Sequence, residues 1–364
     1  MERARATPTR KRPAPAAEGP ADAGAAAEPT VHRVYLLVSD LMRPRPGVYY
    51  ADLIASAAVG WGAIVGCGRV LPSPAAAPLF ALAVLSLYRA AIFIHEITHL
   101  RPGAVPGFDT VWNCVVGVPL LMPSLLYAGG VHSVHHAKPH YGTRRDPEYL
   151  PLGRWPRWKR AVWVLHAALV PAAAALRFVV LTPLSLLHPR LRSWVWARAS
   201  SLAINPAFVR GPPPPGLRTR FRVQEAACLG WGASVIALVA AGLLRGRYVL
   251  VAAAVAAAVG VVNQLRTLVA HRFAHDGAAS LDFEEQFLDS VNVPGHPLLT
   301  ALWAPVGLRY HALHHLLPGL PYHALGTAHR RILRALPADA AYHRVNEPSL
   351  ATALRSLDRG ARRR

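Results

Sequence analysis

Long apolar stretches separated by short polar breaks predict two helical hairpins in this chain. Each of four stretches is long enough to cross the apolar core of a bilayer as an α-helix. The breaks inside the two pairs are only a few residues long, at 72–74 in the first pair and 245–247 in the second. We therefore expect an all-α polytopic membrane protein with four transmembrane helices, at about residues 49–71, 76–96, 226–244 and 248–270.

Two further apolar stretches are interrupted in a way that argues against a simple crossing. Residues 111–130 contain two prolines and a pair of glycines, and residues 161–187 contain Pro171 and Pro183. A single crossing by either stretch would place the histidines before it and after it on opposite membrane faces. If those histidines share one site, both stretches are re-entrant or interfacial helices whose broken backbone is covered by protein.

The two ends of the chain are more polar than its middle. Residues 1–30 are rich in Ala, Pro, Arg and Glu, which predicts a disordered N-terminal tail. Residues 31–335 form the membrane domain, and residues 276–364 are polar enough for a soluble, mostly helical cytoplasmic cap. Residues 336–364 form a basic C-terminal tail that ends in three arginines.

Composition favours a membrane protein over a nucleic-acid-binding protein. The chain is 53% hydrophobic and only 16% charged, yet its formal net charge is +21. The basic residues flank apolar stretches and do not gather in one polar domain, so their placement follows the positive-inside rule. We expect an arginine-rich cytoplasmic face that carries both termini and the histidine-rich cap, with no nucleic-acid partner.

Histidines recur at helical spacing in four places along the chain, out of eighteen histidines in all. Side chains at i, i+3 and i+4 share one face of a helix, and several neutral imidazoles on one face can bind a transition metal. Buried imidazoles without partners are costly to keep in such numbers, which argues against satisfied core or surface histidines as the explanation. The four clusters are His95 and His99; His132, His135 and His136; His271 and His275; and His311, His314 and His315.

The first cluster, His95-Glu96-Ile97-Thr98-His99, also satisfies the H-E-x-x-H motif of zinc proteases. An intramembrane zinc metalloprotease, with Glu96 as general base, is therefore one reading of the chain. A catalytic zinc needs three protein ligands, whereas about ten candidate histidines are present here. That supply fits two metal ions of higher coordination number better, and Glu96 would then orient a ligand imidazole.

The three boxes His95-x-x-x-His99, His132-x-x-His135-His136 and His311-x-x-His314-His315, with apolar hairpins between them, resemble those of the membrane fatty acid desaturase and hydroxylase superfamily. The order, spacing and preceding hairpins match over roughly residues 49–335. The first box is similar to that of sphingolipid and acyl-lipid desaturases. The residues around the other two boxes resemble the bacterial branch, which implies a protein of the bacterial inner membrane.

The resemblance implies two non-haem irons held by the eight box histidines and by His271 at the end of the last transmembrane helix. Some relatives place an asparagine four residues before that last histidine. Here the position is Thr267, with Asn263 one turn earlier, so His275 or water is left to complete the coordination. His323 is a further candidate beside the metals. The carboxylates expected to accept hydrogen bonds from ligand imidazoles are Asp146, Glu148, Glu285 and Asp289.

The resemblance also implies the reaction, which breaks an unactivated C–H bond with O2 and two electrons from outside. We expect desaturation of an acyl chain of a fatty acid or lipid, with hydroxylation of a lipid or carotenoid as the alternative. The chain carries no haem, flavin or dinucleotide motif and no cysteine cluster, so a separate ferredoxin, rubredoxin or cytochrome is implied. A basic cytoplasmic face would attract an acidic carrier.

Overall fold

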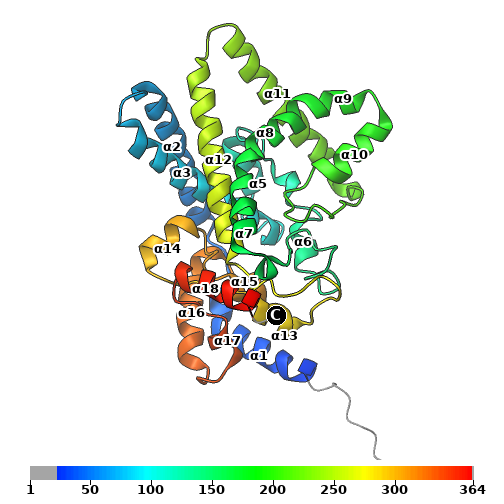
Figure 1. Ribbon diagram of the computed structural model, residues 1–364, viewed down its shortest axis with the longest axis vertical. Coiled ribbons are helices and arrows are strands. Elements are labelled where there is room, and N and C mark those ends of the chain that lie inside the picture. The colour runs from blue at the N-terminus through cyan, green and yellow to red at the C-terminus, as the bar shows by residue number, and fades with distance from the viewer. Residues whose placement is uncertain (1–22, 363–364) are drawn as a thin grey trace, which may run out of the picture.

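The computed structural model describes residues 23–362, and over these residues the all-α expectation is confirmed. Helices account for the regular structure, and pairing between extended segments is limited to isolated bridges. The long apolar helices form one half of the molecule and shorter helices form the other half (Figure 1). The boxes lie where the two halves meet.

Both predicted pairs of helices are present, and α12 (Gly246–Leu268) of the second pair packs against both helices of the first. In the first, α2 (Pro46–Val70) pairs with α3 (Ala76–Ala91), which continues into α4 (Phe93–His99). In the second, a short turn joins α11 (Arg218–Ala240) to α12, and the two helices then diverge: α12 packs against α2 and α3, whereas α11 packs against residues 176–181. The ring of Tyr248 packs so closely over Gly68 that a Cβ atom there would lie 2.4 Å from it. Both hairpin tips are therefore at the same end of the molecule, away from the boxes (Figure 1).

Helix α11 begins at Arg218, well before the predicted start at residue 226. The early turns contain Gln224 and Glu225, whose polarity ended the apolar stretch in the sequence. Both side chains are buried and bonded: Glu225 accepts from Arg177 and Arg192, and Gln224 accepts from the backbone N–H of Leu125. Distant partners satisfy these groups, so the helix continues through them.

A fifth helical run, Arg157–Leu186, is also long and apolar enough to cross a membrane. It joins α7 (Arg157–Leu165), α8 (Val170–Ala175) and α9 (Thr182–Leu186), and α10 (Pro189–Ala199) then leads back. The return is complete by Ile204 and Asn205, whose backbone N–H groups both donate to the carbonyl of Pro147, at 2.9 and 3.0 Å. After the helical run, the chain therefore returns to Pro147, which lies just before the run in the sequence. The run is a candidate span by its length and composition alone.

The interrupted stretch 111–130 is not among the candidate spans. It contains the end of α5 (Phe108–Trp112), a π-helical turn to Gly117 and a short turn at Ser124–Leu126 before α6 (His132–His135). Asn113 holds the bend, because its amide donates to the Ser124 hydroxyl and its carbonyl accepts from the Ser124 backbone N–H, both at 2.9 Å. Protein groups therefore satisfy the broken backbone, as expected for such a segment at membrane depth.

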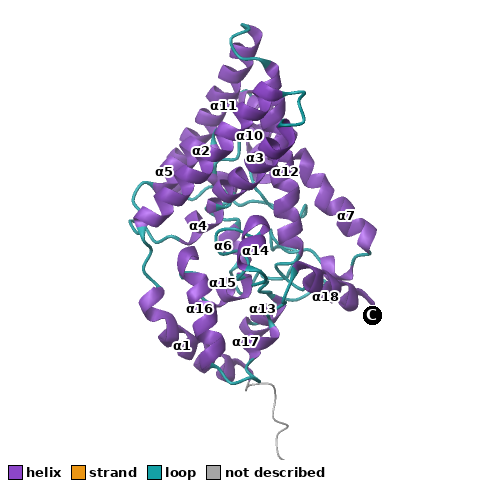
Figure 2. Cartoon of the chain, turned by 90° about the vertical axis from the view of Figure 1, so that its left-hand side faces the viewer, coloured by secondary structure: helices purple, strands orange, loops and turns teal. Residues whose placement is uncertain are grey.

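The second half of the molecule is the helical cap seen in Figure 2. Helix α18 packs through Ala353 and Leu357 into a small core beside the 3₁₀ turn Leu152–Arg154. Residues 336–362, expected as a tail, therefore belong to the folded cap. Helix α1 begins inside the segment 1–30 that was expected to be disordered, and residues 1–22 lie outside the described residues. The cap helices are α1 (Ala23–Val38), α13 (Phe283–Asp289), α14 (Pro297–Trp303), α15 (His311–Leu316), α16 (Tyr322–Ala335), α17 (Ala341–Arg344) and α18 (Leu350–Arg362).

Candidate metal centre

Histidines from all four sequence clusters converge into two compact groups. Within each group, one possible ligand atom from every residue lies within 4.8 Å of the others. Neighbouring rings of the two groups are also close, with the His132 and His135 centroids 5.9 Å apart. The first group is His95, His99, His132 and His314, and the second is His135, His271, His311 and His315.

His136 is the one box histidine outside both groups, and it lies between them. Its Nε2 atom is 3.0 Å from His132 Nε2 and 3.3 Å from His314 Nε2, both in the first group. Its ring stacks on His315 of the second group, with the centroids 4.4 Å apart. The structure therefore brings together all nine histidines expected from the sequence.

Four separate chain segments supply these rings. Box one occupies α4, the last turns of an apolar helix, and box two occupies α6, directly after Gly129 and Gly130, which both have positive φ. Box three forms α15 in the cap. His271 follows α12 and pairs across an isolated bridge with Ser290, so the last apolar helix delivers its histidine to the cap.

The ring nitrogens face one another within each group. His132 Nε2 is 2.8 Å from His99 Nε2, and His311 Nε2 lies 2.9 Å from His271 Nε2 and 3.1 Å from His315 Nε2. Neutral imidazole has one donor and one acceptor nitrogen, so such mutual contacts cannot satisfy every ring. Rings that turn several Nε2 atoms toward one point are arranged as ligands of a metal ion are.

The opposite nitrogens of two rings are held by carboxylates. His132 Nδ1 lies 2.7 Å from Glu148 Oε1, and the hydroxyl of Tyr127 donates to Glu148 Oε2 at 2.8 Å. His135 Nδ1 lies 3.0 Å from both carboxylate oxygens of Asp146, which is fully buried. An Nδ1–H donated to a carboxylate fixes the tautomer that leaves Nε2 with its lone pair free for a metal.

A third ring is held through a tyrosine. The Tyr141 hydroxyl lies 2.7 Å from His271 Nδ1 and 3.2 Å from Asp289 Oδ2, and Asp289 Oδ2 is 3.6 Å from His271 Nδ1. Asp289 thus acts on His271 mainly through Tyr141. Sequence reasoning found the carboxylates but missed Tyr127 and Tyr141, which follow no spacing rule relative to the histidines that they contact.

Burial favours the neutral, metal-binding form of these imidazoles. It lowers the pKa of His136, His311, His314 and His315 well below the usual range, and neighbouring histidines lower it further. Both ring nitrogens of His95 and Nδ1 of His311 are buried without a hydrogen-bond partner among the described residues. Unpartnered buried nitrogens are costly, and a metal bound in the first group would satisfy one of the two His95 nitrogens. The donor set therefore fits two transition-metal ions.

The other candidate residues lie elsewhere, outside the two histidine groups. His323 accepts from the backbone N–H of Arg45, and the backbone N–H of His275 donates to the Tyr149 hydroxyl. The Thr267 hydroxyl donates to the Asn263 carbonyl, and the Asn263 side chain accepts from Arg266. Glu285 is exposed, and its side chain completes the capping box at the start of α13. It therefore does not accept a hydrogen bond from a ligand imidazole.

Glu96 is buried but does not serve the imidazoles beside it in the chain. Its Oε2 atom accepts from the Tyr49 hydroxyl at 2.7 Å and from the backbone N–H of Tyr322 at 3.3 Å. The expectation that Glu96 orients a ligand imidazole is therefore wrong, and this side chain instead links α4 to α2 and α16. A protease would need this carboxylate beside a metal-bound water, so its position argues against the zinc-protease reading.

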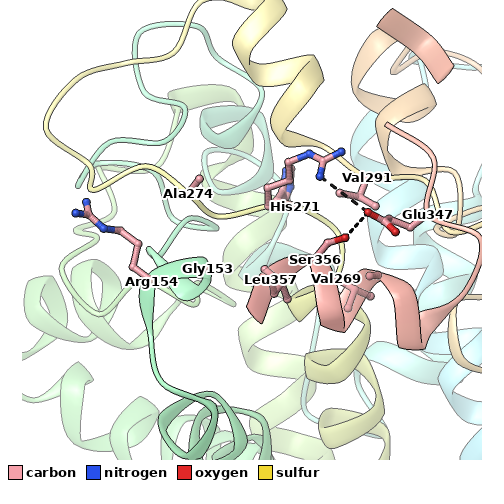
Figure 3. A pocket seen from close by; sticks show the side chains of 11 residues that line it. Gly153, Arg154, Val269, His271, Ala274, Val291, Glu347, Ser356 and Leu357 are labelled. Atoms are coloured by element: carbon pink, nitrogen blue, oxygen red, sulfur yellow. Dashed lines mark hydrogen bonds and ion pairs between the residues drawn. The ribbon is translucent and has the colours of Figure 1, made fainter. Parts of the chain in front are cut away.

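Two cavities reach the histidine groups from different sides. One of about 360 Å³ touches His99 and is lined by Tyr35, Ser39, Arg43, Tyr49, Leu100 and Leu320, among others. The other, of about 160 Å³, has His271 in its wall, with Gly153 on one side and Ser356 and Leu357 of α18 on the other (Figure 3). Glu347 at its rim accepts from the Ser356 hydroxyl at 2.6 Å.

Comparison with known proteins agrees with this site. The model of the fatty acid desaturase family matches residues 71–346, which include all nine histidines. Over 328 residues the chain is 48% identical to a protein of Caulobacter vibrioides named ceramide hydroxylase, covering 90% of this chain and 93% of that relative. With its long apolar helices and paired histidine groups, the chain belongs to the fatty acid desaturase family, as an integral membrane, O2-dependent oxidoreductase that acts on lipids.

Proposed function

We propose that this enzyme is a diiron oxidase that hydroxylates a ceramide-type lipid. The observation that carries the proposal is the convergence of nine histidines into two adjacent groups, joined to extensive identity with a protein named ceramide hydroxylase. The histidine boxes alone led us to expect desaturation. Identity over nearly the whole length of both chains now favours hydroxylation.

In this proposal His95, His99, His132 and His314 hold one iron, and His135, His271, His311 and His315 hold the other. His136 lies between the groups, where it completes the coordination of either ion. The two irons, when bound, supply the activation of O2 that attack on an unactivated C–H bond requires. Three of these rings keep the proton on Nδ1, which leaves Nε2 free to bind metal. The partners of Nδ1 are Glu148 for His132, Asp146 for His135 and the Tyr141–Asp289 pair for His271.

The cavity beside His99 is the proposed access route for the lipid. Its volume of about 360 Å³ is within the range of ligand pockets. Ser39, Arg43 and Tyr49 offer polar contacts for a head group, while Met42, Leu100 and Leu320 suit an acyl or sphingoid chain. Because His99 is only partly buried and lies in the wall of this cavity, a lipid there would reach the first histidine group.

The proposed topology has four crossings, with both termini and the histidine groups on the cytoplasmic side of a bacterial inner membrane. Both hairpin tips lie together at the opposite end, which supports two complete hairpins. The return of the chain to Pro147 supports a re-entrant reading of residues 157–186, because α10 is only eleven residues long and too short to recross the bilayer. The arginine excess around the cap agrees with the positive-inside rule.

Electrons would come from a separate carrier of the ferredoxin, rubredoxin or cytochrome type, because the reaction needs two electrons per turnover. The net charge of +21 suits an acidic carrier, whose encounter with a basic surface is accelerated by electrostatic attraction. This part of the proposal is independent of which lipid is the substrate.

The test is incubation of the purified enzyme with ceramide, an electron-donor system and 18O2, followed by mass spectrometry of the lipid. Hydroxylation adds one 18O atom to the product, whereas desaturation removes two hydrogens and adds no oxygen. A product labelled with 18O supports the proposal. An unlabelled alkene would instead support desaturation, the second candidate, which the family match favours. Absence of either product with ceramide, but turnover of a free fatty acid, would overturn the proposed substrate class.

A further inference from the structure

A third cavity, of about 480 Å³, lies away from the histidine groups and is strongly basic. It is formed between α10, the start of α11 and the loop that joins them (Figure 1). Trp196 and Phe221 form part of its wall. Five arginines and one glutamate also line it: Arg177, Arg192, Arg210, Arg218, Arg222 and Glu225.

The single carboxylate neutralises only part of this charge. Glu225 accepts from Arg177 at 2.7 Å and from Arg192 at 2.8 Å, so two arginines share one negative charge. Arg210, Arg218 and Arg222 form no ion pair with any residue in the described range 23–362. The lining therefore carries a net positive charge of four, from five arginines and one glutamate.

Arg210 is built into the cavity wall and is not a mobile surface side chain. It is only 4% exposed, and its guanidinium stacks on Trp196 and Phe221 at 4.5 and 5.4 Å from the ring centroids. Both of its terminal nitrogens donate to backbone carbonyls, one to Ser200 and the other to Ala128 and Gly129, and only Nε has no hydrogen-bond partner among the described residues. These bonds fix a positive charge in the cavity wall that no carboxylate among the described residues neutralises.

The start of α11 adds further positive potential to the same cavity. Its first turn contains no acidic residue and no side-chain cap, so no carboxylate there offsets the positive end of the helix dipole. A helix N-terminus together with arginines forms a site for phosphate, which guanidinium groups bind with two parallel hydrogen bonds.

We propose that this cavity binds a phosphate group, carried by an anionic lipid head group or present as the free ion. Arg218 and Arg222 stand at the beginning of a helix long and apolar enough to cross the membrane, which is the depth of lipid head groups. The aromatic rings of Trp196 and Phe221 add an apolar wall that a lipid would contact. This inference does not rest on the proposed hydroxylation.

The test is thermal unfolding of the delipidated full-length protein in a neutral detergent. Three probes are titrated separately: dioctanoyl phosphatidic acid, dioctanoyl phosphatidylcholine and inorganic phosphate. The variant is Arg218→Gln with Arg222→Gln, which removes two exposed arginines that are not paired to Glu225. The matched control is Arg190→Gln with Arg198→Gln, which removes the same charge from exposed positions of α10 outside the cavity.

We expect phosphatidic acid to raise the unfolding temperature of the wild type and of the control at similar concentrations. The Arg218/Arg222 variant should need at least ~10-fold more, because each charge-assisted hydrogen bond is worth about a tenfold change or more. Phosphatidylcholine should have little effect. An equal, arginine-dependent response to inorganic phosphate would identify the free ion as a sufficient ligand. No stabilisation by either anion, or the same response in both double variants, would overturn the proposal.

Discussion

Replacing Asp146 by asparagine changes a single carboxylate oxygen to an amide nitrogen, at a fully buried site. We expect this change to lower iron affinity and activity although it leaves every ligand in place. The carboxylate accepts from His135 Nδ1 at 3.0 Å, from the Gly142 backbone N–H at 3.0 Å and from the Glu148 backbone N–H at 2.8 Å. An amide at this site presents an N–H to at least one of these donors.

The easiest relief for His135 is to change tautomer. Its Nδ1 would then accept from the Asn amide, and the proton would move to Nε2, which faces the second histidine group. A protonated Nε2 cannot bind a metal, so that group would lose one of its four ligands. Loss of such an outer partner weakens metal binding by about 10–100-fold, equivalent to about 1.4–2.7 kcal/mol.

The alanine variant separates positioning from folding. Asp146→Ala leaves three buried donors without an acceptor, at about 1–3 kcal/mol each, or about 3–9 kcal/mol in total. That loss is comparable to the whole stability of a typical protein, about 5–15 kcal/mol. We therefore expect Asp146→Ala to yield little folded protein, whereas Asp146→Asn folds and inserts.

The assay is iron content by mass spectrometry, together with turnover of the lipid substrate and thermal unfolding in detergent. The control is Asp276→Asn, which changes a carboxylate that is 63% exposed, accepts from the Ala278 backbone N–H and forms its one ion pair within residues 23–362 with the surface residue Arg154. Asp276→Asn should match the wild type in all three measurements. Wild-type iron content and turnover in folded Asp146→Asn would refute the reasoning that this carboxylate orients a ligand.

Further predictions concern the ligands, the backbone beside them, the metal and the carrier. His315→Ala and His136→Ala should each abolish turnover while the protein still inserts into membranes, and full activity in either would contradict the ligand assignment. Gly153→Ala would place a Cβ atom 2.3 Å from the backbone oxygen of Arg272, next to His271. We therefore expect the free energy of unfolding to fall by about 1–3 kcal/mol and the iron content to fall with it. Unchanged iron content would argue that the backbone at Arg272 does not position His271. Removing the metals with a chelator should lower the unfolding temperature, by about 2.7 kcal/mol of stability for ligand at a hundred times its Kd, and iron should restore it. Raising the salt concentration should slow turnover with an acidic carrier, and salt-independent rates would exclude electrostatic attraction of the carrier.

The elements that sequence could predict are those whose signal is local. The apolar hairpins and the histidine spacing are read within a few tens of residues, and both are present at nearly the expected positions. The carboxylates Asp146, Glu148 and Asp289 were also found, since acids near a histidine-rich site are the usual partners of ligand imidazoles.

The parts that sequence missed depend on contacts between distant segments. Tyr141 reaches His271 from 130 positions away, and Glu96 is engaged by Tyr49 of another helix. The early start of α11 depends on Arg177 and Arg192, which satisfy Glu225 from outside the helix. No local periodicity records these pairings, so a sequence rule that excludes polar residues from an apolar helix began this helix too late in the chain.

The C-terminal segment was assigned a basic tail from residue 336 for a related reason, although it was also expected to belong to the helical cap. Its basic composition suggested a solvated end, but Ala353 and Leu357 lie on one face of α18 and are buried. Asp358 on the same helix pairs with Arg157 and Arg160. The amphipathic spacing was present in the sequence, and high charge concealed it.

The most direct test of the central claim is the metal content of the purified enzyme, measured with X-ray absorption at the metal edge. The account predicts about two irons per chain, each surrounded mainly by imidazole nitrogen, with the content falling when a histidine of either group is replaced by alanine. A single zinc per chain, or iron content that is indifferent to loss of those histidines, would contradict it.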